Sequence, residues 1–170
     1  MSRVRAEVLN AKRVGAYHSI TIVAPEVAER VRPGQFVSVA MPEGRTFLLR
    51  RHFSIHQASR RGGWAGTLEF VFDPRGPGSS WLAEVKAHQF LDVIGPLGKA
   101  FAYPSKLTTC LLVAEGHGSA PIYFLGQELL ARRTEGNLAV EVEAVVWMNG
   151  GLYPELPRPT AGQQMLLDPD

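Results

Sequence analysis

The chain has 170 residues, of which 45% are hydrophobic and 20% are charged, and its formal net charge is +2 at pH 7. This balance is typical of one globular domain, or of a small domain plus part of a second, and it argues against a disordered chain. Because the net charge is small and basic residues are spread along the chain, the composition does not favour nucleic acid as a partner.

The sequence contains one cysteine, Cys110, and no long apolar segment. One cysteine cannot form a disulfide within the chain, and it cannot supply the four ligands of an iron–sulfur centre. We therefore expect no metal site and no iron–sulfur cluster in this chain. The N-terminus lacks the apolar stretch of a secretory signal, and no run reaches the ~20 apolar residues that cross a bilayer. These features predict a cytoplasmic protein without a membrane span.

The first hundred residues predict an antiparallel barrel or sandwich. Short β-prone segments alternate with turns that contain glycine or proline, as is typical of these folds. The expected strands cover residues 4–9, 18–23, 35–41, 51–57, 67–72 and 90–94. One short helix interrupts them, expected from Trp81 to about Lys86 and capped by Ser79 and Ser80.

The pattern changes near Pro104. Residues 107–114 form a near-continuous apolar run, which predicts a strand buried on both faces of a parallel sheet. A glycine-rich turn follows, and then a helix expected over residues 120–132 and a valine-rich strand over residues 137–147. Because a single βαβ unit cannot bury both faces of its sheet, we expect the second domain to be incomplete.

Three short motifs could bind a phosphorylated cofactor. The first is RHFSI at residues 51–55. An arginine there offers a planar fork for a diphosphate, an aromatic ring can pack against a flat ligand, and a hydroxyl can hydrogen-bond to a ring nitrogen. Taken alone, the same residues are explained by a strand-edge arginine beside a core phenylalanine. The arginines around this segment, at positions 45, 50, 51, 60 and 61, could meet phosphates or simply form a solvated basic edge.

The other two motifs are rich in glycine. GPGSS at residues 76–80 opens the short helix, where glycines let the backbone approach a ligand and free N–H groups attract phosphate. An ordinary tight turn explains it equally well. GHGSAP at residues 116–121 lies between a strand and a helix, which is the setting that nucleotide binding requires. Its proline could also simply start the helix.

In their order along the chain, these motifs resemble those of the ferredoxin–NADP reductase superfamily, and most of all the electron-transfer subunits of dihydroorotate dehydrogenase. The matching segments are PGQFVSVAMPEG, LLRRHFSIHQAS, VFDPRGPGSSWL, LDVIGPLGKAF and LLVAEGHGSAPIYFL, within about residues 3–133. The resemblance implies a six-stranded antiparallel Greek-key flavin-binding barrel over residues 1–103. It also implies a partial Rossmann-like βαβ nucleotide domain over residues 104–170.

The resemblance further implies roles for individual residues. Arg51 would hold the diphosphate of FAD, which is expected rather than FMN, and Phe53 would line the isoalloxazine. Ser54, the candidate catalytic residue, would lie near the reactive N5 edge. The expected cofactor-binding residues are Arg51, His52, Phe53, Ser54, Ile55, Gly76, Gly78, Ser79, Gly116, Gly118 and Pro121, of which the last three would form the nicotinamide-nucleotide turn.

The implied function is an electron-transfer component between NAD(P)H and a partner, either a catalytic oxidoreductase subunit or an electron acceptor protein. Such a complex would serve dihydroorotate oxidation in pyrimidine biosynthesis. The sequence departs from the family pattern at His52, where proline is usual, at Ala114 and Glu115, where glycines are usual, and at His117, where an apolar residue is usual. Glu115 would place a negative charge near a dinucleotide phosphate, which weighs against NAD(P)H binding, whereas His117 could touch a phosphate or simply face solvent. One alternative is a shortened, non-catalytic barrel that serves as a binding or assembly module, and another is a reductase that uses free flavin as its substrate.

Overall fold

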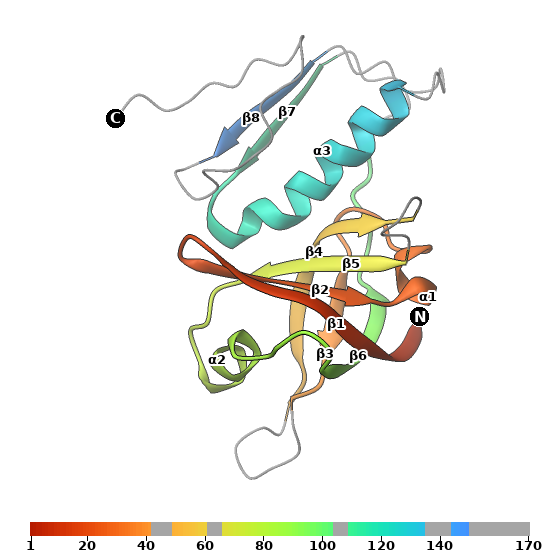
Figure 1. Ribbon diagram of the computed structural model, residues 1–170. Helices are drawn as coiled ribbons and strands as arrows, with labels where there is room; N and C mark the ends of the chain where they lie inside the picture. Colours follow the sequence, from red (N-terminus) through yellow and green to blue (C-terminus); the bar gives the residue numbers. More distant parts are fainter. Residues whose placement is uncertain (42–48, 61–65, 104–108, 135–143, 150–170) are drawn as a thin grey trace.

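A computed structural model describes residues 1–41, 49–60, 66–103, 109–134 and 144–149 (Figure 1). Its first part is a closed antiparallel barrel with the strand order β1-β2-β5-β4-β3-β6. The strands are β1 (Ser2–Val14), β2 (Tyr17–Val23), β3 (Phe36–Val39), β4 (Arg51–Ser59), β5 (Thr67–Phe72) and β6 (Phe90–Leu97). Every expected strand of the first hundred residues is present, so the predicted barrel is confirmed.

Apolar side chains that alternate along the strands fill the barrel interior. On β4, Phe53 and Ile55 point inward and are 8% and 0% exposed. The Phe53 ring stacks on Phe70 of β5, with ring centroids 5.1 Å apart. Because successive side chains of a strand point to opposite faces, His52 and Ser54 lie on the outer surface of the barrel.

Close-packed turns connect the strands. A short helix, α1 (Pro25–Ala28), buries Val27 against the barrel. Pro25 opens this helix, at a position where proline's fixed φ and missing N–H are well tolerated. At Gly34, where φ is +92°, an added Cβ would lie 2.8 Å from the backbone nitrogen of Phe101. This turn therefore requires glycine both for its backbone angle and for space.

The helix α2 (Pro77–Ala83) lies beside the barrel (Figure 1) and buries Leu82 fully in the barrel core. The predicted start at Trp81, capped by the serines at 79 and 80, is wrong, because the helix begins four residues earlier and Gly76 is its N-cap. Its first residue is a proline, whose missing N–H needs no partner at that position. The Ser79 hydroxyl instead accepts a hydrogen bond from the Gly76 nitrogen and donates one to the Gly76 oxygen, both 3.1 Å long.

The chain then forms a βαβ unit from β7 (Thr109–Ala114), a 3-10 turn (Gly116–Gly118), α3 (Ser119–Thr134) and β8 (Ala144–Asn149). The two strands pair in parallel over their full described length. The predicted strand–turn–helix–strand order is confirmed. Of the predicted second strand, residues 137–143 lie outside the described residues.

The first of these strands does not have both faces buried, as the apolar run predicted. Leu112 is 4% exposed and packs with Leu125 and Leu129 of α3. Its neighbours Leu111 and Val113, which point to the opposite face, are 58% and 59% exposed. The expectation failed because one helix can cover only one face of a two-stranded sheet.

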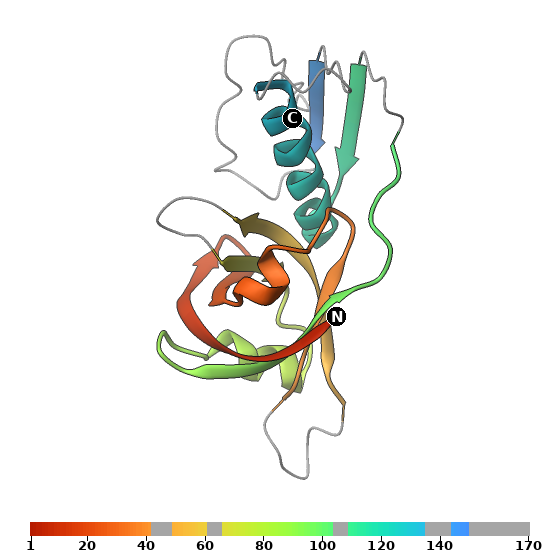
Figure 2. The ribbon, with the colours of Figure 1, turned by 90° about the vertical axis from the view of Figure 1, so that its right-hand side faces the viewer.

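The helix α3 runs between the two-stranded sheet and the barrel (Figures 1 and 2). Leu125 and Leu129 face β7, whereas Phe124 is 2% exposed and belongs to the core cluster of the barrel. The helix therefore joins the two parts through two different faces. The predicted domain boundary between residues 103 and 104 borders a segment outside the described residues and stays a prediction. None of the described helices is both long enough and apolar enough to cross a bilayer.

Candidate functional site

The Arg51 guanidinium lies beside the glycine turn that opens α2. A Cβ added at Gly78 would lie 3.3 Å from Arg51 Nε and 3.3 Å from the sulfur of Met41, whereas one at Gly76 would meet no atom within 4 Å. Within the described residues Arg51 makes one hydrogen bond, from Nη1 to the carbonyl oxygen of Leu49 at 3.2 Å. An arginine has five N–H donors, so this contact leaves donors for an anion at the turn. The structure thus brings together two of the three predicted motifs.

The outer surface of β4 carries His52 and Ser54, both exposed. Ser54 lies opposite Phe36 of β3, and the His52 ring meets the Phe36 ring edge-on, with centroids 5.3 Å apart. A hydroxyl and two rings are therefore available on this surface. The position of Phe53 does not support the prediction that it lines a flavin, because its ring packs into the barrel interior. Ile55 is likewise a core residue.

The first half of α3 covers the far end of β4. His56 is 9% exposed and stacks on Tyr123 of α3, with centroids 4.3 Å apart and an angle of 17° between the rings. Burial lowers the pKa of His56, and the charge of Glu69 partly offsets this. Ala120, in the first turn of α3, is fully buried and packs in one cluster with Val71 of β5. Sequence reasoning missed these contacts, because no local pattern indicates that α3 folds back onto β4.

The glycine-rich turn before α3 contains the third predicted motif. Gly116 has a φ of +58°, and the turn from Gly116 to Gly118 is a single 3-10 turn. The substituted residues Glu115 and His117 are both exposed. Pro121 is the third residue of α3 rather than its first. The fixed position of Ala120 against the barrel places this turn next to β5, on the side of the barrel that α3 covers.

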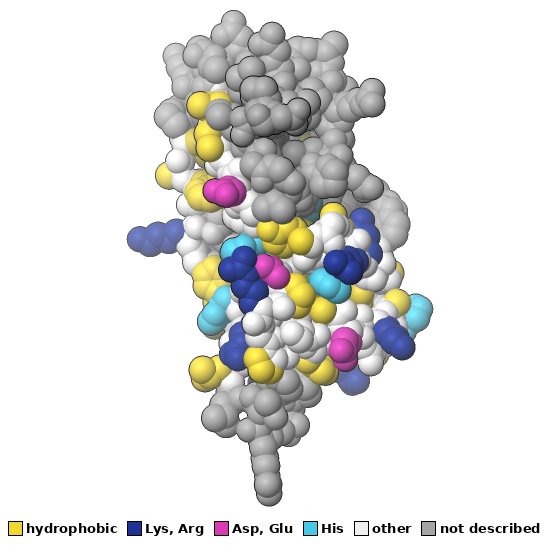
Figure 3. Space-filling model, turned by 90° about the vertical axis from the view of Figure 1, so that its left-hand side faces the viewer, with side chains coloured by type: hydrophobic (Ala, Val, Ile, Leu, Met, Phe, Trp, Pro, Cys, Tyr) yellow, Lys and Arg dark blue, Asp and Glu magenta, His cyan; other side chains and the backbone are white. Residues whose placement is uncertain are grey.

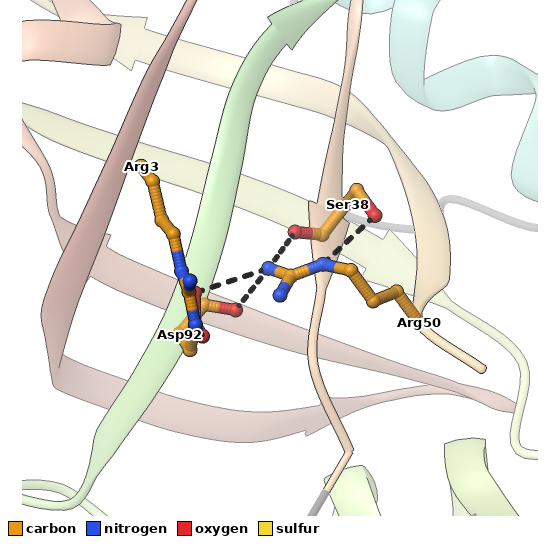
Figure 4. Close-up of polar contacts among 4 residues, drawn as sticks. All are labelled: Arg3, Ser38, Arg50 and Asp92. Carbon is orange, nitrogen blue, oxygen red and sulfur yellow. Dashed lines mark hydrogen bonds and ion pairs between the residues drawn. The ribbon is translucent and has the colours of Figure 1, made fainter. Parts of the chain in front are cut away.

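A second arginine, Arg50, is bound to the barrel itself (Figure 4). Its Nη2 donates to the carbonyl oxygens of Ser38 at 2.8 Å and Asp92 at 2.7 Å, and its Nε donates to the Ser38 hydroxyl at 3.2 Å. The Asp92 carboxylate also pairs with Arg3, at 2.5 Å, and with Arg50, at 3.2 Å. The hydrogen bond from Arg3, aided by Arg50, lowers the pKa of Asp92 to about 2 against the opposing effect of burial. The sequence could not tell which of the two arginines is structural.

The face of the molecule in Figure 3 has no large patch of one charge among its described residues. Lysines and arginines are interspersed there with histidines, acidic residues and apolar side chains. Within the described residues, no three His, Cys, Asp or Glu side chains lie together as a metal site would require. Cys110 is partly buried, and this burial raises the pKa of its thiol. This face therefore offers no large patch of one sign for a polyanion.

The chain is similar in sequence to known electron transfer subunits. No family model matches the chain. Over 106 residues it is 40% identical to the dihydroorotate dehydrogenase B (NAD(+)) electron transfer subunit of Desulforamulus reducens, covering 62% of this chain and 39% of that protein. Over 135 residues it is 32% identical to the corresponding subunit of Bacillus mycoides, covering 78% of this chain and 51% of that protein. The chain is related to these electron transfer subunits. It spans about half of their length or less.

Solved structures agree with this relationship at the level of the fold. The structure of an NADH-dependent reduced ferredoxin-NADP oxidoreductase matches with a TM-score of 0.71 and 21% identity, over 96% of this chain and 56% of the other. Phthalate dioxygenase reductase matches with a TM-score of 0.64 and 15% identity, over 98% and 52%. These structures confirm the predicted fold, a six-stranded antiparallel barrel followed by a βαβ unit.

Proposed function

We propose that this chain binds FAD on the barrel and works as an electron-transfer component of an oxidoreductase complex. The observation that carries the proposal is the position of Arg51 beside the Gly76–Ser79 turn. A flavin diphosphate is bound well by a planar cation beside a backbone without bulky side chains. Arg51 provides the cation, and Gly76 and Gly78 provide the open backbone. The match to the electron transfer subunit of Bacillus mycoides covers 78% of the chain, which is long enough to include this region.

The described residues fit the diphosphate end of FAD better than the ring end. Gly76 is open on the side where a Cβ would lie, and Arg51 keeps donors for phosphate oxygens. On the ring side, the Ser54 hydroxyl is exposed beside Phe36 and His52. We propose that this outer surface of β4 meets the isoalloxazine and that Ser54 hydrogen-bonds to its N5 edge. His52, which stands where proline is usual in the family, would then provide part of the ring contact that was expected from Phe53.

The chemistry of the complex would come from the flavin, which accepts electrons in pairs and passes them on singly. The residues of this chain would bind and orient it. Arg51 would neutralise the diphosphate, and Ser54 would hold a hydrogen bond at the edge where electrons enter. The helix α3, fixed on β4 through His56 and Tyr123, would keep water from one side of this surface.

We further propose that the electrons come from NAD(P)H and pass to a catalytic oxidoreductase subunit, as in a complex for dihydroorotate oxidation. The support is the sequence relationship, together with the position of the Gly116–Gly118 turn near the barrel. The exposed Glu115 opposes nucleotide binding at this turn, because a carboxylate repels a phosphate. NAD(P)H binding therefore depends on groups beyond those the turn itself provides.

A visible spectrum of the purified protein tests the proposal. We expect absorption bands of a bound flavin, or their appearance with quenched flavin fluorescence when FAD is added to the apoprotein. FMN should bind more weakly, because it lacks the second phosphate and the adenosine. A colourless protein that binds neither flavin would contradict the proposal. It would favour the alternative of a binding or assembly module. The exposed apolar side chains of Leu111 and Val113 support that alternative, because such a face is typical of a protein-binding surface.

Bleaching of the bound flavin by NADH or NADPH under anaerobic conditions tests the electron donor separately. Flavin binding without bleaching would agree with the proposed FAD binding, but it would contradict the proposal that NAD(P)H is the electron donor. Weak flavin retention with continuous NAD(P)H turnover on added free flavin would instead indicate a free-flavin reductase.

A further inference from the structure

We propose that Arg50 is a positioning residue that sets the direction of Arg51, and so acts on FAD binding without touching the cofactor. This inference rests on the proposed function, because it assumes that Arg51 meets the FAD diphosphate. Its basis is the network of Arg50, Ser38, Asp92 and Arg3 shown in Figure 4.

The network fixes the Arg50 side chain across two strands. From the residue just before β4 it reaches over β3, where it donates to the hydroxyl and the carbonyl oxygen of Ser38, and on to β6, where it donates to Asp92. Ser38 is 4% exposed, and only 27% of the Arg50 side chain is exposed. The Asp92 carbonyl accepts a second hydrogen bond, from the backbone nitrogen of Ala40 at 2.8 Å. Arg50 therefore binds to groups that the barrel already holds in place.

The place of Arg50 in the chain explains why it matters for Arg51. Residue 50 directly precedes β4, and residues 42–48 before it lie outside the described part of the chain. Consecutive side chains of an extended strand point to opposite sides, so a side chain held on the outer surface at position 50 directs position 51 the other way. That direction leads to α2, where Arg51 Nε lies within 3.3 Å of the Cβ position of Gly78.

The two arginines are therefore not equivalent, although they are adjacent and identical. Without these bonds, the residue before β4 would no longer be tied to β3 and β6, and the guanidinium of Arg51 could change its direction relative to the phosphates. A bidentate contact between arginine and a phosphate is sensitive to such a change in direction. Arg50 would thus influence FAD affinity only through Arg51.

A double-mutant cycle on FAD affinity tests this. The dissociation constant of FAD is measured by flavin fluorescence quenching for the full chain and for Arg50→Met, Arg51→Ala and the double variant. We expect Arg50→Met to raise the dissociation constant about five- to tenfold in the wild-type background and less than about twofold in the Arg51→Ala background. Arg3→Met is the matched control, because it removes the other arginine from Asp92 without touching β4, and it should change the affinity less than about twofold.

Arg50→Lys keeps the charge and can still reach the carbonyl oxygens, so it should recover part of the lost affinity, and it replaces Arg50→Met if that variant does not fold. Equal effects of Arg50→Met in both backgrounds would overturn the inference, because they would indicate a general loss of structure. An effect of Arg3→Met as large as that of Arg50→Met would also overturn it. A wild-type protein that binds no FAD would refute the proposed function itself, whereas binding that Arg50→Met leaves unchanged would refute only this inference.

Discussion

Truncation of Phe124 to alanine tests whether α3 is part of the barrel core. The Phe124 ring comes from the helix of the βαβ unit, yet it is 2% exposed among the core residues of the barrel. Removing a buried phenylalanine ring costs about 3–5 kcal/mol when the surroundings cannot collapse. If α3 could detach, the cost would be limited to its docking energy. The ion pair between Arg60 and Glu128, at 2.8 Å, also holds the helix on the barrel, so the helix is not free to detach. We therefore expect Phe124→Ala to lower the free energy of unfolding by about 3 kcal/mol.

Urea denaturation followed by far-UV circular dichroism measures this loss as a shift of the midpoint at constant slope. Ile122→Ala is the control, because it removes a partly buried side chain of the same helix that packs in the β7 cluster. It should cost about 1–2 kcal/mol and leave the barrel intact. The reasoning would be refuted if Phe124→Ala cost less than about 1 kcal/mol. A separate early transition with an unchanged main transition would also refute it, since α3 would then unfold independently.

Gly34→Ala should destabilise the protein by about 2–4 kcal/mol and Gly15→Ala by only about 1 kcal/mol, because both glycines have positive φ but only Gly34 would also press a Cβ against backbone; equal losses in thermal denaturation would contradict this. Arg51→Ala should raise the FAD dissociation constant about ten- to a hundredfold, the effect of a hydrogen bond to a charged group, and an effect below twofold would exclude Arg51 as the diphosphate ligand. The pKa of Asp92 is about 2 in the folded protein against an ordinary value of 3.8, so its ion pairs stabilise the fold above about pH 4, and this stability is lost as the pH falls towards 2. After allowance for solvent screening the contribution is about 1 kcal/mol, and Asp92→Asn should flatten the dependence of stability on pH over this interval.

The barrel could be predicted from the sequence because each strand carries its own signal. Alternation of apolar residues and turns with glycine or proline gave every strand of the barrel, and the bounds of β5 agree at both ends. The start of α2 was mispredicted because serine is the more familiar cap. Glycine followed by proline opens a helix as well, and here the fixed φ of the proline decides where the helix begins.

The candidate site was only partly predictable. In the structure, side chains at alternate positions of β4 place Phe53 with Ile55 in the core, and this two-residue period, which the prediction of Phe53 as a ring contact did not use, argues against a ligand contact for Phe53. The contact of His56 with Tyr123 could not be foreseen, since it depends on how α3 returns to the barrel across more than sixty residues of sequence. Nor could composition separate Arg50 from Arg51, because that difference depends on acceptors contributed by β3 and β6.

The two faces of α3 imply that flavin binding and nucleotide binding differ in how much structure they need. One face completes the barrel core through Phe124, so the surface that we propose for FAD is held by residues of the described barrel and one helix. The other face covers only one side of β7, and Leu111 and Val113 on the opposite side stay more than half exposed. A two-stranded sheet with one uncovered apolar face buries little surface, so the part of the chain that we propose for the nucleotide is the less stable one. We therefore expect this chain to hold FAD with higher stability than it holds NAD(P)H, and a titration in which NAD(P)H binds as tightly as FAD would contradict that conclusion.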